Sequence, residues 1–159
     1  MQVVKEAGLV FSKKKLELFK TEVKYLGHII RNGELTLQTH AVEFADKFPD
    51  KSTDKVQLQR FLGSLNYISH FYKGCAQDRK LLNDRLKKDP TPWTEAHSQA
   101  VRNIKSKAKT LPLLYISNDD LPKIVETNAS NLGWGAVLKQ VRKQEGKKRE
   151  EIVQFASGI

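Results

Sequence analysis

The chain has 159 residues, 39% of them hydrophobic, so it can bury a core as one domain or two small ones. No apolar run approaches the roughly 20 residues of a membrane-spanning helix, and the N-terminus lacks the pattern of a signal peptide. The single cysteine, Cys75, excludes internal disulfides and cysteine-based zinc sites. We therefore expect an intracellular protein without membrane contact.

The net charge of +10 favours a polyanionic partner, most often nucleic acid. A lysine-rich soluble surface would give the same charge balance, so composition alone leaves both interpretations open.

The first part of the chain predicts a small antiparallel sheet over residues 16–38. Val23–Ile30 is rich in β-formers, and Asn32-Gly33 is a strong hairpin signal. Glu34–Gln38 alternates leucine with polar residues, which indicates the return strand. Gln2–Ala7 is typical of a helix end stopped by a glycine, and Leu16–Phe19 is typical of a further strand.

Helices are predicted next. Thr39–Lys47 forms a short helix that Phe48-Pro49 ends, and residues 52–54 offer N-caps for a longer one. Gly63 lies within that longer helix, where glycine usually has a close-packing reason. An apolar stripe follows the helical period: Leu58, Phe61, Leu62, Leu65 and Ile68.

Two basic helices complete this part, over Gln77–Lys88 and from the N-cap Thr94 onward. Between Lys73 and Lys109 there are ten Lys or Arg residues against four Asp or Glu residues. The second helix is predicted to turn one set of side chains inward: Ala96, Ala100, Val101, Ile104 and Ala108.

The last part is predicted to be β-structure. Leu111–Ile116 is a short buried-type strand, and a boundary near 119–122 precedes three more strands over 123–127, 133–141 and 151–155. The charge-dense stretch 141–151 is interpreted as a solvated hairpin connection. The whole pattern indicates an α+β fold: a small antiparallel hairpin region, helices, and a second β-sheet.

Catalytic chemistry has little support from the residues alone. A two-metal hydrolase needs several converging carboxylates, whereas the stretch IVETNASNLGWG offers Glu126 and the neutral amide of Asn128. The simplest interpretation of Asn128 is an Asx-type turn at a strand end. The four histidines lack metal-ligand spacing, so we expect no metal, no cofactor and no catalytic residue.

Nucleic-acid binding has more support, because basic helices can neutralise phosphates. Four aromatic residues in or beside the basic stretches serve equally well as core or as stacking platforms: Tyr67, Phe71, Tyr72 and Trp93.

An ordered set of strings runs through nearly the whole chain: YLGHIIRNGELTLQTH, FPDK, QLQRFLGSLNYISHF, PWT, LPLLYI, IVETNASNLGWGAVLKQ and EEIVQFASGI. Together they resemble the reverse transcriptase polyprotein of plant pararetroviruses, the caulimovirus and badnavirus relatives, and more distantly that of gypsy-type retrotransposons. The resemblance implies four regions: a palm remnant with a primer-grip-like hairpin (1–39), thumb-like helices (40–72), a basic connection (73–122) and truncated RNase H-like strands (123–159).

The resemblance also implies lost catalysis. The family's RNase H strand reads Thr-Asp-Ala-Ser, and Asn128 stands where its Asp binds the first metal ion. The family's other RNase H carboxylates and its Tyr-x-Asp-Asp polymerase motif lie in elements beyond both ends of this sequence. We therefore expect a catalytically inactive, domesticated viral protein that binds RNA, DNA or hybrid without sequence preference. The nucleic-acid-binding residues expected are Tyr25, Gly27, His28, Gln59, Arg60, Gly63, Asn66, Lys73, Arg79, Lys80, Arg102 and Lys105.

Two other hypotheses remain open at this stage. Surfaces left exposed by missing neighbours would suit a host protein partner or self-association into a homo-oligomer. Alternatively, the chain is one piece of an active RNA-directed DNA polymerase.

Overall fold

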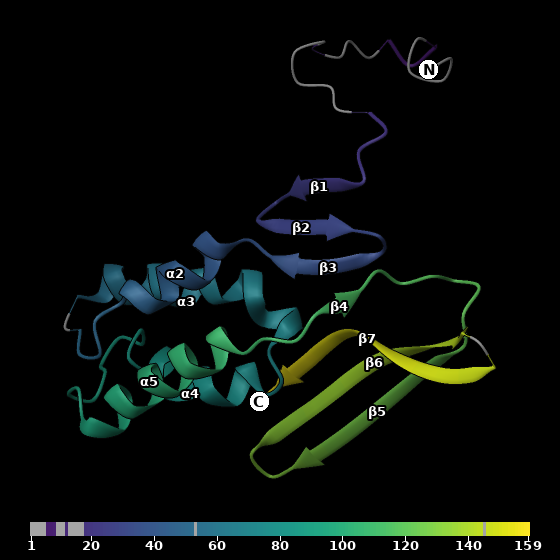
Figure 1. Cartoon of the computed structure of the whole chain (residues 1–159). Coiled ribbons are helices and arrows are strands. Elements are labelled where there is room, and N and C mark those ends of the chain that lie inside the picture. Colours follow the sequence, from purple (N-terminus) through teal and green to yellow (C-terminus); the bar gives the residue numbers. More distant parts are fainter. Residues whose placement is uncertain (1–5, 9–11, 13–17, 53, 145) are drawn as a thin grey trace.

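The computed structural model describes residues 6–8, 12, 18–52, 54–144 and 146–159. The molecule has three parts: a small sheet, a body of helices, and a larger sheet beside the helices (Figure 1). This arrangement confirms the predicted α+β class. The predicted helix end at 2–7 and strand at 16–19 lie largely outside the described residues.

The small sheet is antiparallel with the order β1-β2-β3-β4. Its strands are β1 (Glu22–Tyr25), β2 (His28–Arg31), β3 (Glu34–Leu37) and β4 (Leu114–Tyr115). The hairpin at Asn32-Gly33 is confirmed, since both residues have the positive φ that such a turn requires, 51° and 80°. The prediction of one strand over 23–30 is wrong, because Leu26-Gly27 forms a second positive-φ turn that divides it.

The helical body contains α2 (Thr39–Lys47), α3 (Lys55–Ile68), the 3₁₀ turn η1 (Ser69–Phe71), α4 (Cys75–Asp84) and α5 (Glu95–Lys109). Asp54 caps α3 by accepting from the Val56 backbone N–H at 2.8 Å. Thr94 caps α5 in a capping box with His97. Helix α4 ends at Asp84 and not at the predicted residue 88.

The core lies between these helices. All five stripe residues of α3 are buried, and Phe61 stacks on Phe48 of the α2 C-cap with ring centroids 4.1 Å apart. Helix α5 contributes Val101, Ile104 and Ala108, as predicted. Ala96 is instead exposed, because the helix turns His97 and Ser98 inward.

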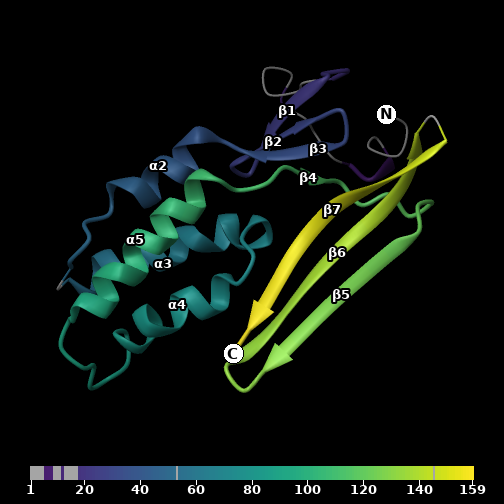
Figure 2. The ribbon, with the colours of Figure 1, turned by 60° about the horizontal axis from the view of Figure 1, so that its bottom comes forward.

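The larger sheet has the order β5-β6-β7, with β5 (Lys123–Ser130), β6 (Gly133–Gln144) and β7 (Lys147–Gly158). The strands are longer than predicted, because the charge-dense stretch continues the ladder to the pair Gln144–Lys147 and is not a loop. The sheet forms a single layer beside the helices (Figure 2). None of the described helices is long and apolar enough to cross a membrane.

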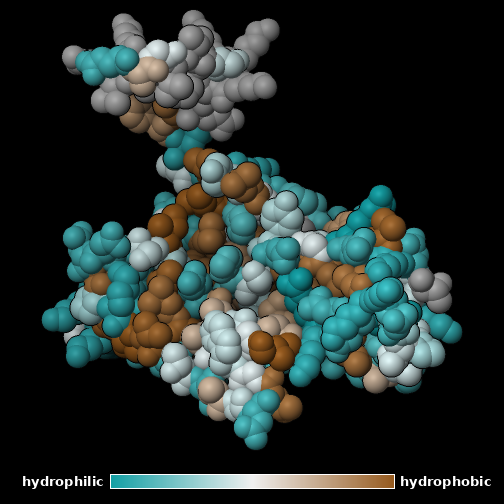
Figure 3. Space-filling model, turned by 180° about the vertical axis from the view of Figure 1, so that it is seen from behind, coloured by the Kyte–Doolittle hydropathy of each residue, from teal (hydrophilic) through white to brown (hydrophobic). Residues whose placement is uncertain are grey.

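Two hydrogen bonds attach this sheet to the start of α4. The Ala76 backbone N–H donates to Ser157 Oγ at 3.0 Å, and Gln77 Nε2 donates to the Trp134 carbonyl at 3.2 Å. The packing around the sheet remains incomplete, since Val125 is 64% and Trp134 48% exposed. Seen from behind, apolar surface forms a band between polar surfaces (Figure 3).

Candidate nucleic-acid interface

The outer face of α3 brings together four of the residues predicted to bind nucleic acid. Gln59, Arg60, Gly63 and Asn66 are all exposed, and they recur with the helical period opposite the buried stripe. Among the described residues, no atom outside the backbone of its own helix lies within 4 Å of the position that a Cβ of Gly63 would take. The described part of the chain therefore gives no close-packing reason for Gly63, and its position is open to an approaching ligand.

A groove of about 750 Å³ lies beside this face, between α2, α3 and the turn that joins β1 to β2. Its lining is Leu26, Gly27, His40, Glu43, Phe44, Lys47, Arg60, Ser64 and Tyr67. Gly27 has φ +83°, a conformation that favours glycine, whereas a Cβ there would make only an ordinary contact with the Tyr67 ring at 3.9 Å; the turn, and not the packing on α3, therefore requires the glycine.

The groove combines aromatic and apolar surface with two cations. Tyr67 is 57% exposed and Leu26 is 68% exposed. Arg60 adds a cation that forms no salt bridge among the described residues, and Lys47 adds a second one that lies 3.9 Å from the Glu43 carboxylate in an exposed pair. Such a surface can hold phosphates at the cations while sugars or bases contact the ring.

The rest of the predicted primer-grip-like residues divide between surface and core. Tyr25 is exposed at the end of β1. His28 is half-buried and stacks on Phe71, with ring centroids 5.7 Å apart and planes 15° from parallel. His28 therefore holds the small sheet on the helical body.

Arg79 extends the α3 surface from helix α4. Its guanidinium donates to Asn66 Oδ1 at 2.9 Å and to the Leu62 carbonyl at 3.0 Å. Both acceptors are neutral, so Arg79 keeps its charge beside the exposed face. Lys80, next along α4, is exposed.

Arg102 and Lys105 lie elsewhere, on α5, and both are paired. Lys105 Nζ lies 2.8 Å from an Asp50 carboxylate oxygen, and Arg102 contacts Asp50 at 3.8 Å and also Glu95. The hydrogen bond from Lys105 lowers the pKa of Asp50, with Arg102 adding to the effect. These cations are neutralised within the chain and are less available to phosphates than Arg60.

Of the four aromatic residues in or beside the basic stretches, three are buried or half-buried and one is exposed. Phe71 and Tyr72 are buried in the body, and Trp93 is half-buried with its indole N–H bonded to Ser98. Burial, together with a hydrogen bond to Asp78, raises the pKa of Tyr72. Among these four, Tyr67 alone is an exposed platform.

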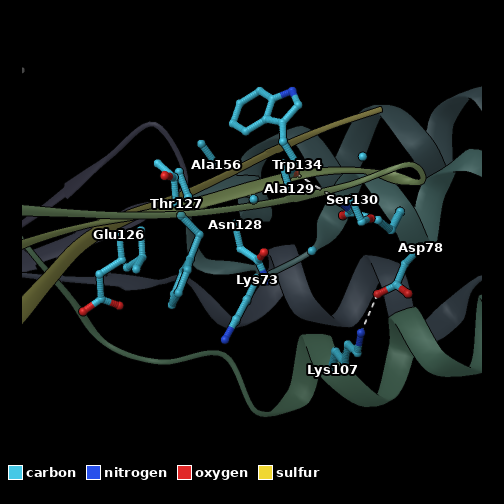
Figure 4. Close-up of a pocket in the computed structure, with 17 residues that line it drawn as sticks. Lys73, Asp78, Lys107, Glu126, Thr127, Asn128, Ala129, Ser130, Trp134 and Ala156 are labelled. Carbon is cyan, nitrogen blue, oxygen red and sulfur yellow. Dashed lines mark hydrogen bonds and ion pairs between the residues drawn. The ribbon is translucent and has the colours of Figure 1, made fainter.

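The remaining predicted position, Lys73, lies in a second pocket of about 500 Å³ between α4, α5 and the larger sheet. Figure 4 shows Lys73 next to Asn128, with the ion pair of Lys107 and Asp78, 2.6 Å long, on another part of its lining. The interpretation of Asn128 as a turn residue is wrong, because β5 continues to Ser130.

The neighbouring carboxylate, Glu126, does not offer a free ligand. Lys139 contacts Glu126 at 2.5 Å and Glu150 at 3.0 Å, so one ammonium group is shared between the two carboxylates and offsets one of their two charges. Across the part of the chain that the structure describes, no three His, Cys, Asp or Glu side chains gather closely enough to hold a metal ion.

Sequence reasoning missed Leu26, Phe44, Lys47 and Ser64. For Phe44 and Lys47 a signal existed: Ala45 and Phe48 face the core, so the helical period turns Phe44 and Lys47 away from it. For Leu26 no such signal existed, because the second turn in 23–30 was hidden in a run of β-formers.

Comparisons with known proteins agree with this fold. Residues 93–159 match the RNase H-like domain found in reverse transcriptase. The enzymatic polyprotein of Carnation etched ring virus is 40% identical over 152 residues, covering 95% of this chain and 22% of the polyprotein. That of Figwort mosaic virus is 40% identical over 159 residues, covering 99% and 23%. The chain therefore spans less than a quarter of these relatives.

Solved structures show the same fold at lower identity. The foamy viral protease-reverse transcriptase in complex with an RNA/DNA hybrid matches with a TM-score of 0.74 and 21% identity, covering 98% of this chain and 21% of that one. The same protein in complex with dsDNA matches with a TM-score of 0.69 and 23% identity, covering 99% and 32%. Residues 93–159 are therefore similar to the RNase H-like domain found in reverse transcriptase, within a chain that is similar along nearly its whole length to part of the caulimovirus enzymatic polyproteins.

Proposed function

We propose that this chain binds nucleic acid through the outer face of α3 and the adjoining groove, and that it performs no catalysis of its own. The observation that carries the proposal is the convergence of Arg60, Lys47 and exposed Tyr67 around one open groove. Phosphate contacts of this kind are insensitive to base sequence and weaken steeply with salt. The structural relatives solved with an RNA/DNA hybrid and with dsDNA support this choice of ligand.

The binding proposal is tested by fluorescence anisotropy at low salt, with RNA/DNA hybrid, duplex RNA, duplex DNA and single strands. The Arg60→Gln variant should bind weaker than wild type, and its salt slope on duplex DNA should fall by about one. Arg102→Gln makes the same chemical change at a cation already paired with Asp50 and Glu95, so its loss should be smaller. Equal losses in both variants would place the site elsewhere, and absence of binding to every ligand would refute the proposal.

The absence of catalysis is proposed from the site around Asn128. A neutral amide is a weak metal ligand, and the Glu126 carboxylate beside it is bonded to Lys139. Asn128→Asp should therefore show no Mg²⁺-dependent cleavage of the RNA in a hybrid. If Asn128→Asp cleaves the RNA and the Asn128→Ala control does not, this one carboxylate is enough to restore a metal site. That outcome would contradict the proposed absence of catalysis.

A protein-binding role is the second candidate, and exposed apolar residues of the larger sheet favour it. Val125, Leu132 and Trp134 are each about half exposed or more, at 64%, 71% and 48%. Exposed apolar side chains can serve as a protein-binding surface where they form a contiguous patch. Light scattering across a concentration series tests self-association, and a strictly monomeric protein would contradict that form of the idea.

A further inference from the structure

The long hairpin of β6 and β7 ends in a strongly basic tip, which we call the prong and define as residues 142–149. In sequence it holds five Lys or Arg residues against one acid, Glu145. The ladder places like charges directly opposite each other, Arg142 with Arg149 and Lys143 with Lys148. Such pairs destabilise a hairpin unless a negative partner is present.

The base of the prong is held firmly by contacts inside the chain. Arg142 Nε donates to Glu151 Oε1 at 2.7 Å, and Glu151 is 2% exposed. Arg149 donates to the Tyr115 hydroxyl at 2.6 Å and lies over the same ring at 5.5 Å. The two arginines are thus occupied, and they fix the hairpin to β4 and to the core of its own sheet.

The three lysines at the tip differ from these arginines. Lys143, Lys147 and Lys148 are exposed, and among the residues with described positions none of them forms a salt bridge. Cross-strand neighbours share a face of the ribbon, so Lys143 and Lys148 lie together while Lys147 projects from the other face. The two-stranded ribbon therefore presents three cations on two faces.

We propose that the prong is a second nucleic-acid contact, in which Lys143, Lys147 and Lys148 bind backbone phosphates. Figures 1 and 2 both place the tip of β6 and β7 at the end of the molecule opposite α2 and α3. The same nucleic acid would extend from the groove to the prong. This inference rests on the proposed function, because it assigns a further site for the same ligand.

Phosphates suit the prong better than other ligands, because its charges are compact lysine ammonium groups without an adjoining apolar pocket among the described residues. Lysine binds phosphate as a point charge and needs no exact geometry. A phosphate backbone also relieves the repulsion between Lys143 and Lys148, so binding and hairpin stability support each other.

The test replaces all three lysines by glutamine and measures binding to duplex DNA across a salt series. The slope of log K against log salt should become shallower by about two to three, since each lost phosphate contact removes about 0.9. The matched control, Lys20→Gln with Lys51→Gln and Lys88→Gln, also removes three exposed lysines that form no salt bridge among the described residues, and it should change the slope by less than one. Thermal unfolding checks folding, and the prong variant should be at least as stable as wild type because the opposed pair is gone.

The outcomes separate the two proposals. If wild type binds, Arg60→Gln weakens binding and the prong variant behaves like its control, the prong inference is overturned while the proposed function stands. If wild type binds no nucleic acid, both fall together.

Discussion

The helical body and the larger sheet are stabilised in different ways. Every buried hydrophobic residue of the described chain lies before residue 123, most of them in α2–α5. Within 123–159, the buried residues of the described part are the polar Gln140 and Glu151. Apolar burial contributes roughly 25 cal/mol per Å², so the body has a large source of stability that the single-layer sheet lacks.

The sheet depends instead on a polar cluster around Glu151. Gln140 Nε2 donates to Glu151 Oε2 at 2.8 Å, and Gln140 Oε1 accepts from the Asn118 backbone N–H at 2.9 Å. With Arg142, this cluster joins both long strands to the segment that enters the sheet. A buried network of this kind is specific, and it is costly when one member is lost.

The largest expected effect comes from the core of the body. Phe61 is fully buried, so Phe61→Ala should lower the free energy of unfolding by about 3–5 kcal/mol, through lost burial and the cavity left behind. Val56→Ala on the same helix is a control, because Val56 is 53% exposed. Urea unfolding followed by circular dichroism measures both. A small loss for Phe61→Ala would show that the body does not depend on this core.

The next effect tests the sheet. Glu151→Gln leaves the Arg142 side chain without its anionic partner and should cost about 1–3 kcal/mol. Hydrogen exchange should speed up in β6 and β7 more than in α3, if the two parts are stabilised separately. Uniform acceleration across the chain would contradict that separation and show one cooperative unit.

Acid should affect the two parts over different ranges. Burial raises the pKa of Glu151, but hydrogen bonds from Arg142 and Gln140 outweigh it and hold the pKa below its ordinary value of 4.5. His97 also has a pKa below its ordinary 6.5, because it is buried and lies near the charge of Arg85. Both groups therefore take up protons more readily in the unfolded chain. Their stabilisation is complete above the ordinary values and is lost as the pH falls through the lowered ones.

In the helical body, the loss of stability on acidification should start near pH 6.5, the ordinary pKa of histidine. His97 Nδ1 accepts the Thr94 backbone N–H at 3.0 Å, and protonation removes this acceptor from the α5 cap. Wild type should lose about 1 kcal/mol as the pH falls from 7 through the lowered pKa. His97→Gln keeps an acceptor that does not titrate, so thermal unfolding of this variant should not change over that range. An equal loss in both would mean that other groups cause it.

The contrast between an apolar helical core and a sheet held by polar contacts explains which parts of the structure the sequence could predict. Periodicity identified the body well, because Leu58, Phe61 and Leu65 repeat with the helical spacing and are buried as expected. The nucleic-acid residues expected on α3 came from the resemblance to the reverse transcriptase thumb, and the helical period places them opposite the buried stripe. The charged β6–β7 tip was interpreted as a loop, because strand propensity is overridden where partners fix the ladder, here through Arg142 and Arg149. Ion pairs across elements, such as Lys105 with Asp50, have no local signal at all.

The smallest change in stability is expected for a substitution of Gly63. This substitution should act in opposite directions on stability and on nucleic-acid binding, so it distinguishes the two. Gly63→Ala should stabilise the body by roughly 0.5–1 kcal/mol, because alanine is the better helix former and, among the described residues, the new methyl group meets no atom within 4 Å outside the backbone of its own helix. The larger sheet should be unaffected by this substitution, as judged by hydrogen exchange. If nucleic acid approaches the α3 backbone closely, the same variant should bind more weakly although it is more stable. Val56→Ala, on the same helix but outside the groove lining, controls for a general change in the helix. Unchanged binding by Gly63→Ala would exclude close approach at this position and limit the interface to the groove.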